Sequence, residues 1–246
     1  MKIDISENDR ELGMKAAQEG AAVLRASAQE KERLTLVIPT GASQFSMFEQ
    51  LIIEPDIPWH RIDVFHLDEY VGIAADHPAS FRRYLRERFV AHVPDLGSFH
   101  EIMGDAPVIE TEIARLNAML GSREIDLCFA GIGENGHLAF NDPPADFETT
   151  DPYILVTLDD KCRRQQYHEG WFESLDDVPV QAISMSVNQI MKCRRLIISV
   201  PEGRKAEAVR DSLQNEISPS FPASILRRHE NCELFLDLDS SKLLKA

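Results

Sequence analysis

Apolar and polar positions follow two different rhythms along this chain. Short apolar runs are typical of buried strands, and segments in which apolar residues recur every three to four positions are typical of amphipathic helices. The apolar runs predict strands at 34–39, 62–70, 125–132, 153–158, 181–187, 194–201 and 232–238. The helical rhythm predicts helices at 8–31, 80–93, 108–120, 204–214 and 223–229.

The order of these elements indicates the fold class. Strands that alternate with helices of this length imply βαβ units and a mainly parallel sheet. We therefore expect an α/β fold with helices on both faces of the sheet, a three-layer Rossmann-like arrangement. No internal repeat and no long linker interrupts the pattern, so we expect a single domain over residues 1–246.

Charge narrows the class of partner. The chain has 26 basic and 41 acidic residues and a formal net charge of −15 at pH 7. Such a chain is repelled by the phosphates of nucleic acids and by anionic membranes. We therefore expect a small-molecule ligand, no nucleic acid and no membrane, and the oligomeric state stays open. An anionic ligand would require a site that is locally positive.

The four cysteines are scattered, at Cys128, Cys162, Cys193 and Cys232, without zinc-type spacing. This usage suits reduced thiols in a cytoplasm. The N-terminal residues contain no apolar core of a signal peptide, and no apolar run reaches the ~18–20 residues of a membrane helix. We expect a cytoplasmic protein.

The loop 131–144, "GIGENGHLAFNDPP", contains a G-x-G-x-x-G pattern after a predicted strand. A dinucleotide site would need a helix that starts at the third glycine. Pro143 and Pro144 would interrupt that helix, although Asp159 and Asp160 lie near the expected acidic position. We expect no dinucleotide site and no cofactor.

The same loop carries residues suited to catalysis. His137 can move a proton near neutral pH, and Asp142 could orient its ring. Asn135 and Asn141 add neutral hydrogen bonds. The alternative is that His137 only stabilises the turn.

Acidic residues end the predicted strand 62–70. Asp68 or Glu69 could act as a general base there, or both could cap a helix or turn. A third interpretation is a metal site formed by Asp68, Glu69, His137 and Asp142. No H-x-H or H-E-x-x-H motif supports it, and we expect no metal.

Two further loops offer groups for an anion. Thr40, Gly41, Ala42 and Ser43 form a turn between a strand and a helix, where backbone amides and hydroxyls can hold a phosphate. The Gly-Lys-Ser/Thr ending of a P-loop is absent, and a turn without ligand is the alternative. Lys205 opens a helix after a strand and could reach a phosphate or lie in solvent. Loops at the carboxyl ends of parallel strands can converge on one pocket.

Several motifs in one order resemble a known family. "TGAS", "HLDEYVGIAADHPASF", "GIGENGHLAFNDP", "EGRKAEAV" and "PASILRRH" are similar to the glucosamine-6-phosphate deaminase (isomerase) family, from about residue 34 to the C-terminus. LDEY followed by HPxSF, together with GIGxNGHxxFN, is specific in combination. The superfamily includes 6-phosphogluconolactonases, but LDEY and "AFND" look more like the deaminases.

The resemblance implies a reaction without a redox cofactor, in which glucosamine 6-phosphate and water give fructose 6-phosphate and ammonia. By matching positions, Asp68 would take the C2 proton and His137 would move a proton during ring opening. Asn135 and Asp142 match residues that support His137. This chemistry belongs to amino-sugar and N-acetylglucosamine catabolism.

The resemblance also implies a phosphate site. Gly41, Ala42 and Ser43 match the family's phosphate turn, with Thr40 beside them, and Lys205 matches its phosphate lysine. Two positions depart from the pattern. Asp142 stands where the family more often has glutamate. In a lid segment near 159–180, the family's phosphate-binding arginine falls on Gly170.

Arg163 and Arg164 are the candidates to replace that lid arginine. The altered lid keeps two alternatives open, a 6-phosphogluconolactonase-type hydrolase and a non-catalytic sensor of hexosamine phosphates. The tail that some allosteric relatives carry is not evident, so we expect no allosteric control by amino sugars.

Overall fold

The computed structural model, which describes residues 1–245, contains a seven-stranded sheet in which all neighbouring strands run parallel. Its strand order is β1 (Lys2–Ser6), β10 (Cys232–Asp237), β9 (Leu196–Val200), β6 (Leu127–Ala130), β2 (Leu34–Ile38), β3 (Ile62–His66) and β5 (Ser98–His100). The predicted parallel sheet is confirmed, and five of its strands lie within predicted ranges.

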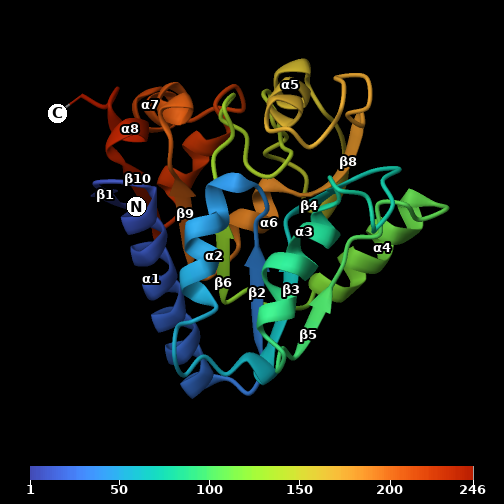
Figure 1. The fold of residues 1–246 in the computed structure, drawn as a ribbon, viewed down its shortest axis with the longest axis vertical. Coiled ribbons are helices and arrows are strands. Elements are labelled where there is room, and N and C mark those ends of the chain that lie inside the picture. Colours follow the sequence, from blue (N-terminus) through green and yellow to red (C-terminus); the bar gives the residue numbers. More distant parts are fainter. Residues whose placement is uncertain (246) are drawn as a thin grey trace.

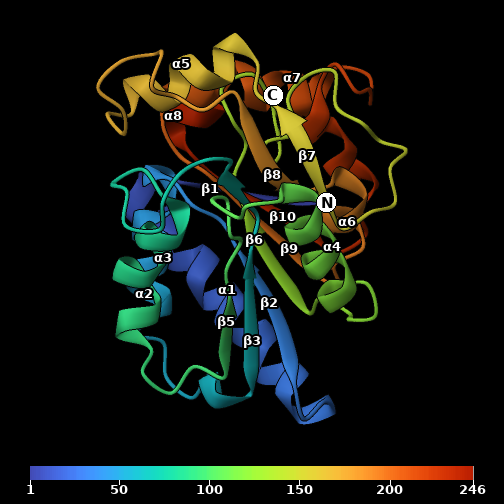
Figure 2. The same cartoon turned by 90° about the vertical axis from the view of Figure 1, so that its right-hand side faces the viewer.

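Helices cover both faces of this sheet, as Figure 2 shows. One face packs against α1 (Asp9–Glu30), α2 (Phe45–Leu51) and α3 (Phe81–Arg88), and the other against α4 (Ile109–Leu120), α6 (Val187–Met191) and α7 (Ala206–Gln214). Strand β2 is apolar on both sides. Leu36 and Ile38 belong to the core shared with α1, α2 and α3, and Val37 belongs to the core shared with α4, α6 and α7. A strand that is apolar on both sides needs a helix layer on each. The predicted three-layer α/β arrangement is confirmed.

A second, antiparallel sheet lies beyond the first, in the order β4 (Asp68–Tyr70), β8 (Gln181–Met185) and β7 (Tyr153–Thr157). The prediction of one strand over 62–70 is wrong. The chain changes sheets at Leu67, whose N–H donates to Ile38 in the first sheet while its carbonyl accepts from Met185 in the second. The predicted strands 153–158 and 181–187 also belong to the small sheet.

Helix α5 (Asp160–His168) and the segment after it cover the small sheet. They share a third apolar core with it, which includes Tyr70, Phe81, Phe140, Cys162 and Phe172. Figure 1 shows α5 beside α7 at the end of the molecule towards which the central strands point. The third core therefore holds the segment 159–180 over the carboxyl ends of the strands.

Other differences from prediction lie at element ends. Strands β1 and β5 were not predicted, because Ile3 and Ile5 are exposed in β1 and β5 has only three residues. The helix expected over 80–93 ends at Arg88, and that over 223–229 is a 3-10 helix, Pro222–Arg228. Asp237 caps the short α8 (Leu238–Ser241). Among residues 1–245, no helix combines the length and apolarity needed to cross a bilayer.

Candidate active site

A cleft of about 570 Å³, open to solvent, lies at the carboxyl ends of β2, β3, β6 and β9. Loops far apart in the sequence meet there, as parallel strands require. Predicted residues that line it are Thr40, Gly41, Ser43, Asp68, His137 and Lys205. Asn135 and Asp142 lie behind His137, and Ala42 begins a 3-10 turn without lining the cleft.

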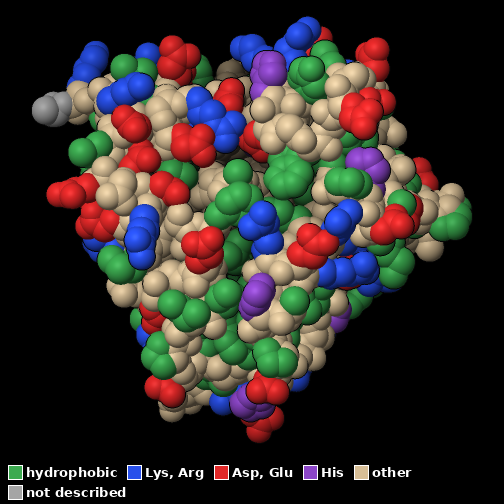
Figure 3. All heavy atoms as spheres, in the orientation of Figure 1, with side chains coloured by type: hydrophobic (Ala, Val, Ile, Leu, Met, Phe, Trp, Pro, Cys, Tyr) green, Lys and Arg blue, Asp and Glu red, His purple; other side chains and the backbone are tan. Residues whose placement is uncertain are grey.

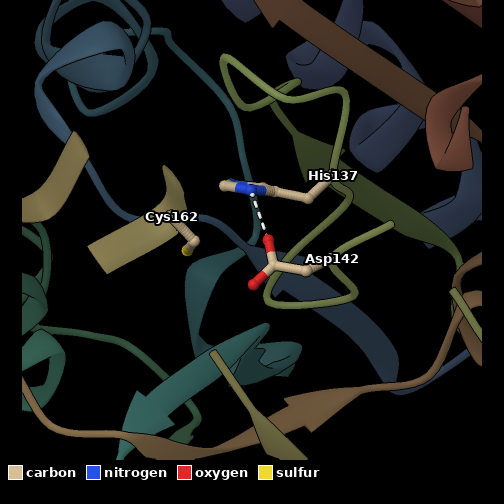
Figure 4. A group of neighbouring side chains, drawn as sticks. All are labelled: His137, Asp142 and Cys162. Atoms are coloured by element: carbon tan, nitrogen blue, oxygen red, sulfur yellow. Dashed lines mark hydrogen bonds and ion pairs between the residues drawn. The ribbon is translucent and has the colours of Figure 1, made fainter. Parts of the chain in front are cut away.

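His137 is held by the loop that follows β6. Its Nδ1 lies 3.1 Å from Oδ1 of Asp142 (Figure 4). Its backbone N–H donates to Oδ1 of Asn135 at 3.1 Å. Burial opposes ionisation of Asp142, but hydrogen bonds from His137, Asn135 and the Asp159 amide outweigh it, so the pKa of Asp142 is lowered. An ionised carboxylate only accepts hydrogen bonds, so Nδ1 of His137 donates, and the neutral form of the ring has its free lone pair on Nε2.

Gly133 is required by the position of this ring. A Cβ atom on Gly133 would lie 2.2 Å from Nε2 of His137. No larger residue fits without moving the imidazole. The first half of the glycine pattern thus makes room for the histidine, which explains a glycine in this loop without any dinucleotide.

Asp68 and Glu69 are neighbours in β4 with different surroundings, because successive side chains of a strand point to opposite faces. Glu69 is fully buried and accepts from the amides of Tyr70, Phe81 and Arg82 and from the hydroxyl of Ser80. It therefore caps α3, which was one of the three interpretations of this pair from the sequence.

Asp68 lines the cleft and is 6% exposed. Burial, followed by the nearby charge of Glu69, raises the pKa of Asp68 to about 8. Burial of this kind gives a carboxylate the basicity that proton abstraction near neutral pH needs.

His66 is a positioning residue that sequence reasoning missed. Its Nδ1 lies 2.9 Å from the carbonyl oxygen of Asp68, and its Nε2 accepts the Ile102 amide at 2.9 Å. Complete burial lowers the pKa of His66 to about 3, so the ring is neutral. It fixes the backbone where the chain leaves β3 and presents Asp68. A histidine inside an apolar strand was the available signal.

The turn after β2 is shaped by Gly41, whose φ of 101° lies in the region that favours glycine. Its carbonyl accepts a hydrogen bond from the Tyr84 hydroxyl at 2.9 Å. Gln44, which was not predicted, also lines the cleft, and its buried Oε1 has no hydrogen-bond partner among residues 1–245. The turn therefore offers Ser43, Gln44 and backbone groups to a ligand.

Lys205 supplies the positive charge of the cleft. It lies in the 3-10 turn Gly203–Lys205 and is only 4% exposed, and its ammonium group makes no hydrogen bond or ion pair with any described residue. Burial, followed by the neighbouring charge of Arg204, lowers the pKa of Lys205. A buried ammonium without a partner is unfavourable unless an anionic ligand provides one. The interpretation of a solvated lysine does not hold.

In the predicted lid segment, residues 159–180, which is called the lid below, the arginines lie away from the cleft. Arg163 donates from Nη2 to the carbonyls of Leu175 (2.8 Å) and Val178 (3.0 Å), and Arg164 is exposed. Neither lines the cleft, because the first is held by the lid's own backbone and the second points to solvent. Gly170 does not line it either. The lid instead contributes Gln165, Gln166 and Glu169.

One arginine does join the lid to the body. Nη1 of Arg204 lies 3.1 Å from Glu169 in the lid and 2.9 Å from Glu134 in the loop after β6. Glu169 also accepts from Gln165 and from the Trp171 indole. On the face in Figure 3, acidic side chains lie among basic ones. Ion pairs of Arg204 therefore join the segment 159–180 to the loop after β6 beside the cleft.

The fold and the cleft define a Rossmann-like α/β protein with acid–base groups and a buried cation at the strand ends. The family model described as "Glucosamine-6-phosphate isomerases/6-phosphogluconolactonase" matches residues 7–235. The chain belongs to this family.

Relatives within the family share most of the chain. Glucosamine-6-phosphate deaminase 1 of Bacillus subtilis is 32% identical over 232 residues, covering 92% of this chain and 94% of the relative. The deaminase of Lactobacillus delbrueckii subsp. bulgaricus is 29% identical, with 100% of each chain covered.

Solved structures agree on the fold. A monomeric glucosamine-6-phosphate deaminase superposes with a TM-score of 0.89 at 30% identity, covering 99% of this chain and 100% of that one. The 6-phosphogluconolactonase from Trypanosoma brucei superposes with a TM-score of 0.81 at 17% identity, covering 99% and 98%. At that identity the second likeness concerns the fold alone.

Proposed function

We propose that this protein is an amino-sugar-phosphate deaminase and isomerase, which converts glucosamine 6-phosphate and water into fructose 6-phosphate and ammonia. The observation that carries the proposal is the joint presence, in one cleft, of a buried carboxyl with a pKa of about 8, an oriented histidine and a buried cation without a partner. The names of the relatives support the same substrate.

Ring opening falls to His137. Nε2 accepts the proton of the C1 hydroxyl while the ring C1–O5 bond breaks, and the ring oxygen receives a proton in return. The Nδ1–H of His137 donates to Asp142 throughout, so the positive charge on the imidazolium is stabilised. Asn135 holds Asp142 in place through a hydrogen bond of 2.9 Å.

Isomerisation falls to Asp68. Its carboxylate removes the proton from C2, next to the open aldehyde, while the aldehyde oxygen takes a proton from the substrate's ammonium group, and an enolamine forms. Return of a proton to C1 gives an iminium at C2, and addition of water followed by loss of ammonia leaves the ketone. No oxidant or reductant is consumed.

The phosphate is bound at the other end of the cleft. Lys205 supplies the charge, and the turn with Thr40, Gly41 and Ser43 supplies backbone amides and hydroxyls. Binding the dianion would provide the partner that the buried ammonium lacks.

The direct experiment incubates the protein with glucosamine 6-phosphate and measures ammonia and fructose 6-phosphate together. Equal amounts of both products support the proposal. Absence of both at high protein concentration contradicts it. Acid release from 6-phosphogluconolactone would favour the hydrolase instead, and saturable binding without product would favour a sensor.

Replacing Lys205 by methionine separates its two expected effects. We expect KM for the sugar phosphate to rise roughly 10- to 100-fold, because a charged hydrogen-bond partner of the phosphate is lost. We also expect greater resistance to urea at neutral pH. Folding lowers the pKa of Lys205 from its ordinary 10.5. Keeping this lysine charged at neutral pH therefore decreases the free energy of unfolding, and methionine removes that cost. The exposed Lys192→Met is the control, and a decrease in stability of the Lys205 variant would contradict the argument.

We propose that residues 159–180 act as a lid within a single domain and that Arg204 holds it closed. Half-exposed ion pairs contribute up to ~1 kcal/mol, so Arg204→Ala should raise KM by about fivefold or less with a smaller change in kcat. Protease cleavage within 159–180 should become faster. Arg210→Ala, which removes an exposed pair with Asp211, is the control. Unchanged KM and cleavage would exclude this role.

A further inference from the structure

Cys162 places a sulfur atom beside the ring-opening residues. A ring nitrogen of His137, a carboxylate oxygen of Asp142 and Sγ of Cys162 all lie within 4.8 Å of one another. Figure 4 shows the Cys162 side chain beside the His137–Asp142 pair. The cysteine comes from α5 in the lid, and the other two come from the loop after β6.

This donor set suits one class of metal ion. Nitrogen, oxygen and sulfur donors together favour zinc over magnesium or calcium, which take oxygen ligands. Bond lengths of ~2.0–2.3 Å place neighbouring ligands of tetrahedral zinc about 3.3–3.8 Å apart. Nδ1 of His137 and Oδ1 of Asp142 are already 3.1 Å apart, so a small movement of the thiol completes three ligands, with water as the fourth.

The surroundings also attract cations. A hollow beside Asn135 is lined by one basic residue, Lys161, and by five acidic residues. The acidic residues are Glu134, Asp159, Asp160, Glu207 and Asp211. Asn135 and Asp159 are the same residues that donate hydrogen bonds to Asp142. A focused negative potential raises the local concentration of divalent ions.

We propose that His137, Asp142 and Cys162 form a binding site for zinc, and that zinc bound there inhibits the enzyme. Binding releases the thiol proton to solvent and moves the Nδ1 proton of His137 to Nε2. A ring that carries its proton on Nε2 has no lone pair for the C1 hydroxyl. The metal also ties α5 to the loop after β6, so the lid is fastened while the histidine is blocked.

The inhibition rests on the proposed function, but the binding does not. Titration of chelator-treated wild-type protein with Zn²⁺ should show one ion per chain, and Co²⁺ as a probe should give the near-ultraviolet band of a thiolate–metal bond. Loss of a direct ligand should weaken binding at least as much as loss of a supporting group, roughly 10-fold or more. We therefore expect weakened zinc binding and no thiolate band in Cys162→Ala and in Cys162→Ser, which keeps the size of the side chain.

Cys232→Ala is the matched control, since Cys232 is also buried and reduced but belongs to a different core. It should bind Zn²⁺ like the wild type. Zinc should lower ammonia release by the wild type and by Cys232→Ala, and a chelator should restore it. The Cys162 variants, each compared with its own metal-free rate, should resist zinc. Equal zinc binding by wild type and Cys162→Ala would overturn the site. If no protein turns over glucosamine 6-phosphate, the proposed function fails, and the cobalt spectrum still decides the metal site.

Discussion

Replacing Asp68 by asparagine is expected to lower kcat for glucosamine 6-phosphate by ~10³-fold or more, which lies within the range for loss of a general base. The amide has the same shape but cannot take the C2 proton. Binding of a phosphate ligand should remain largely unchanged, because Lys205 and the turn at Gly41 belong to other elements. Steady-state kinetics and a binding titration check the two halves, and retained turnover would show that the base is another group.

The same substitution has an expected effect on folding. The pKa of Asp68 rises on folding from 3.8 to about 8. Below the unfolded pKa, such a carboxyl does not decrease the free energy of unfolding. As the pH rises from the unfolded to the folded pKa, the carboxyl decreases the free energy of unfolding more and more, and above the folded pKa the decrease stays constant. Asparagine causes no such decrease. Asp68→Asn should therefore be more stable than the wild type at pH 8, by a few kcal/mol, and nearly equal at pH 4.

Urea unfolding at both pH values measures this difference, and the exposed Asp76→Asn is the control. In the wild type, kcat/KM should rise with pH and level off above about pH 8, because the free enzyme must lose the Asp68 proton. A stability difference that does not change with pH would mean that folding does not raise the pKa of Asp68.

Replacing Gly133 by alanine is expected to lower kcat/KM by ~100-fold, the effect of displacing a catalytic group by about 1 Å. The added Cβ would lie 2.2 Å from Nε2 and 2.3 Å from Cε1 of His137, so the imidazole must move. The φ angle at Gly133 is not in the positive region, unlike that at Gly136. Alanine is therefore tolerated by the backbone, and the effect should come from the ring.

A double-mutant cycle distinguishes displacement of the His137 ring from a wider change in the structure of the loop. Once His137 is replaced by glutamine, adding Gly133→Ala should cost little more activity, because both changes act on the same group. Additive losses would show that Gly133 acts through something other than His137. The Gly133→Ala protein should still bind the phosphate ligand, since the three atoms nearest to the added Cβ all belong to His137.

The parallel sheet was predictable because its central strands are buried on both faces and read as continuous apolar runs. Convergence of the loops after β2, β3, β6 and β9 followed from that topology. The break at Leu67 could not be read from the sequence. It depends on hydrogen bonds to Ile38 and Met185, far along the chain, while the run 62–70 itself shows no interruption.

The lid was the least predictable part of the candidate site. Helix α5 is polar, and its order depends on contacts with Tyr70, Phe140 and Phe172 rather than on its own pattern. Position along the chain could not tell which way Arg163 points, and backbone carbonyls of the lid hold it. The roles of Asp68, Asn135, His137, Asp142 and Lys205 in the reaction stay predictions until the variants are measured.

The positions of Asp68 and Glu69 determine which insertions and deletions in the gene would preserve the site. One carboxyl is left free in the cleft and the other is saturated with hydrogen bonds at the start of α3. The two side chains differ only because successive residues of β4 point to opposite faces of the strand. Deletion of a single codon before this strand would point the capping glutamate into the cleft and bury the base. We therefore expect insertions and deletions to be tolerated in the surface loops but not between Leu67 and Tyr70.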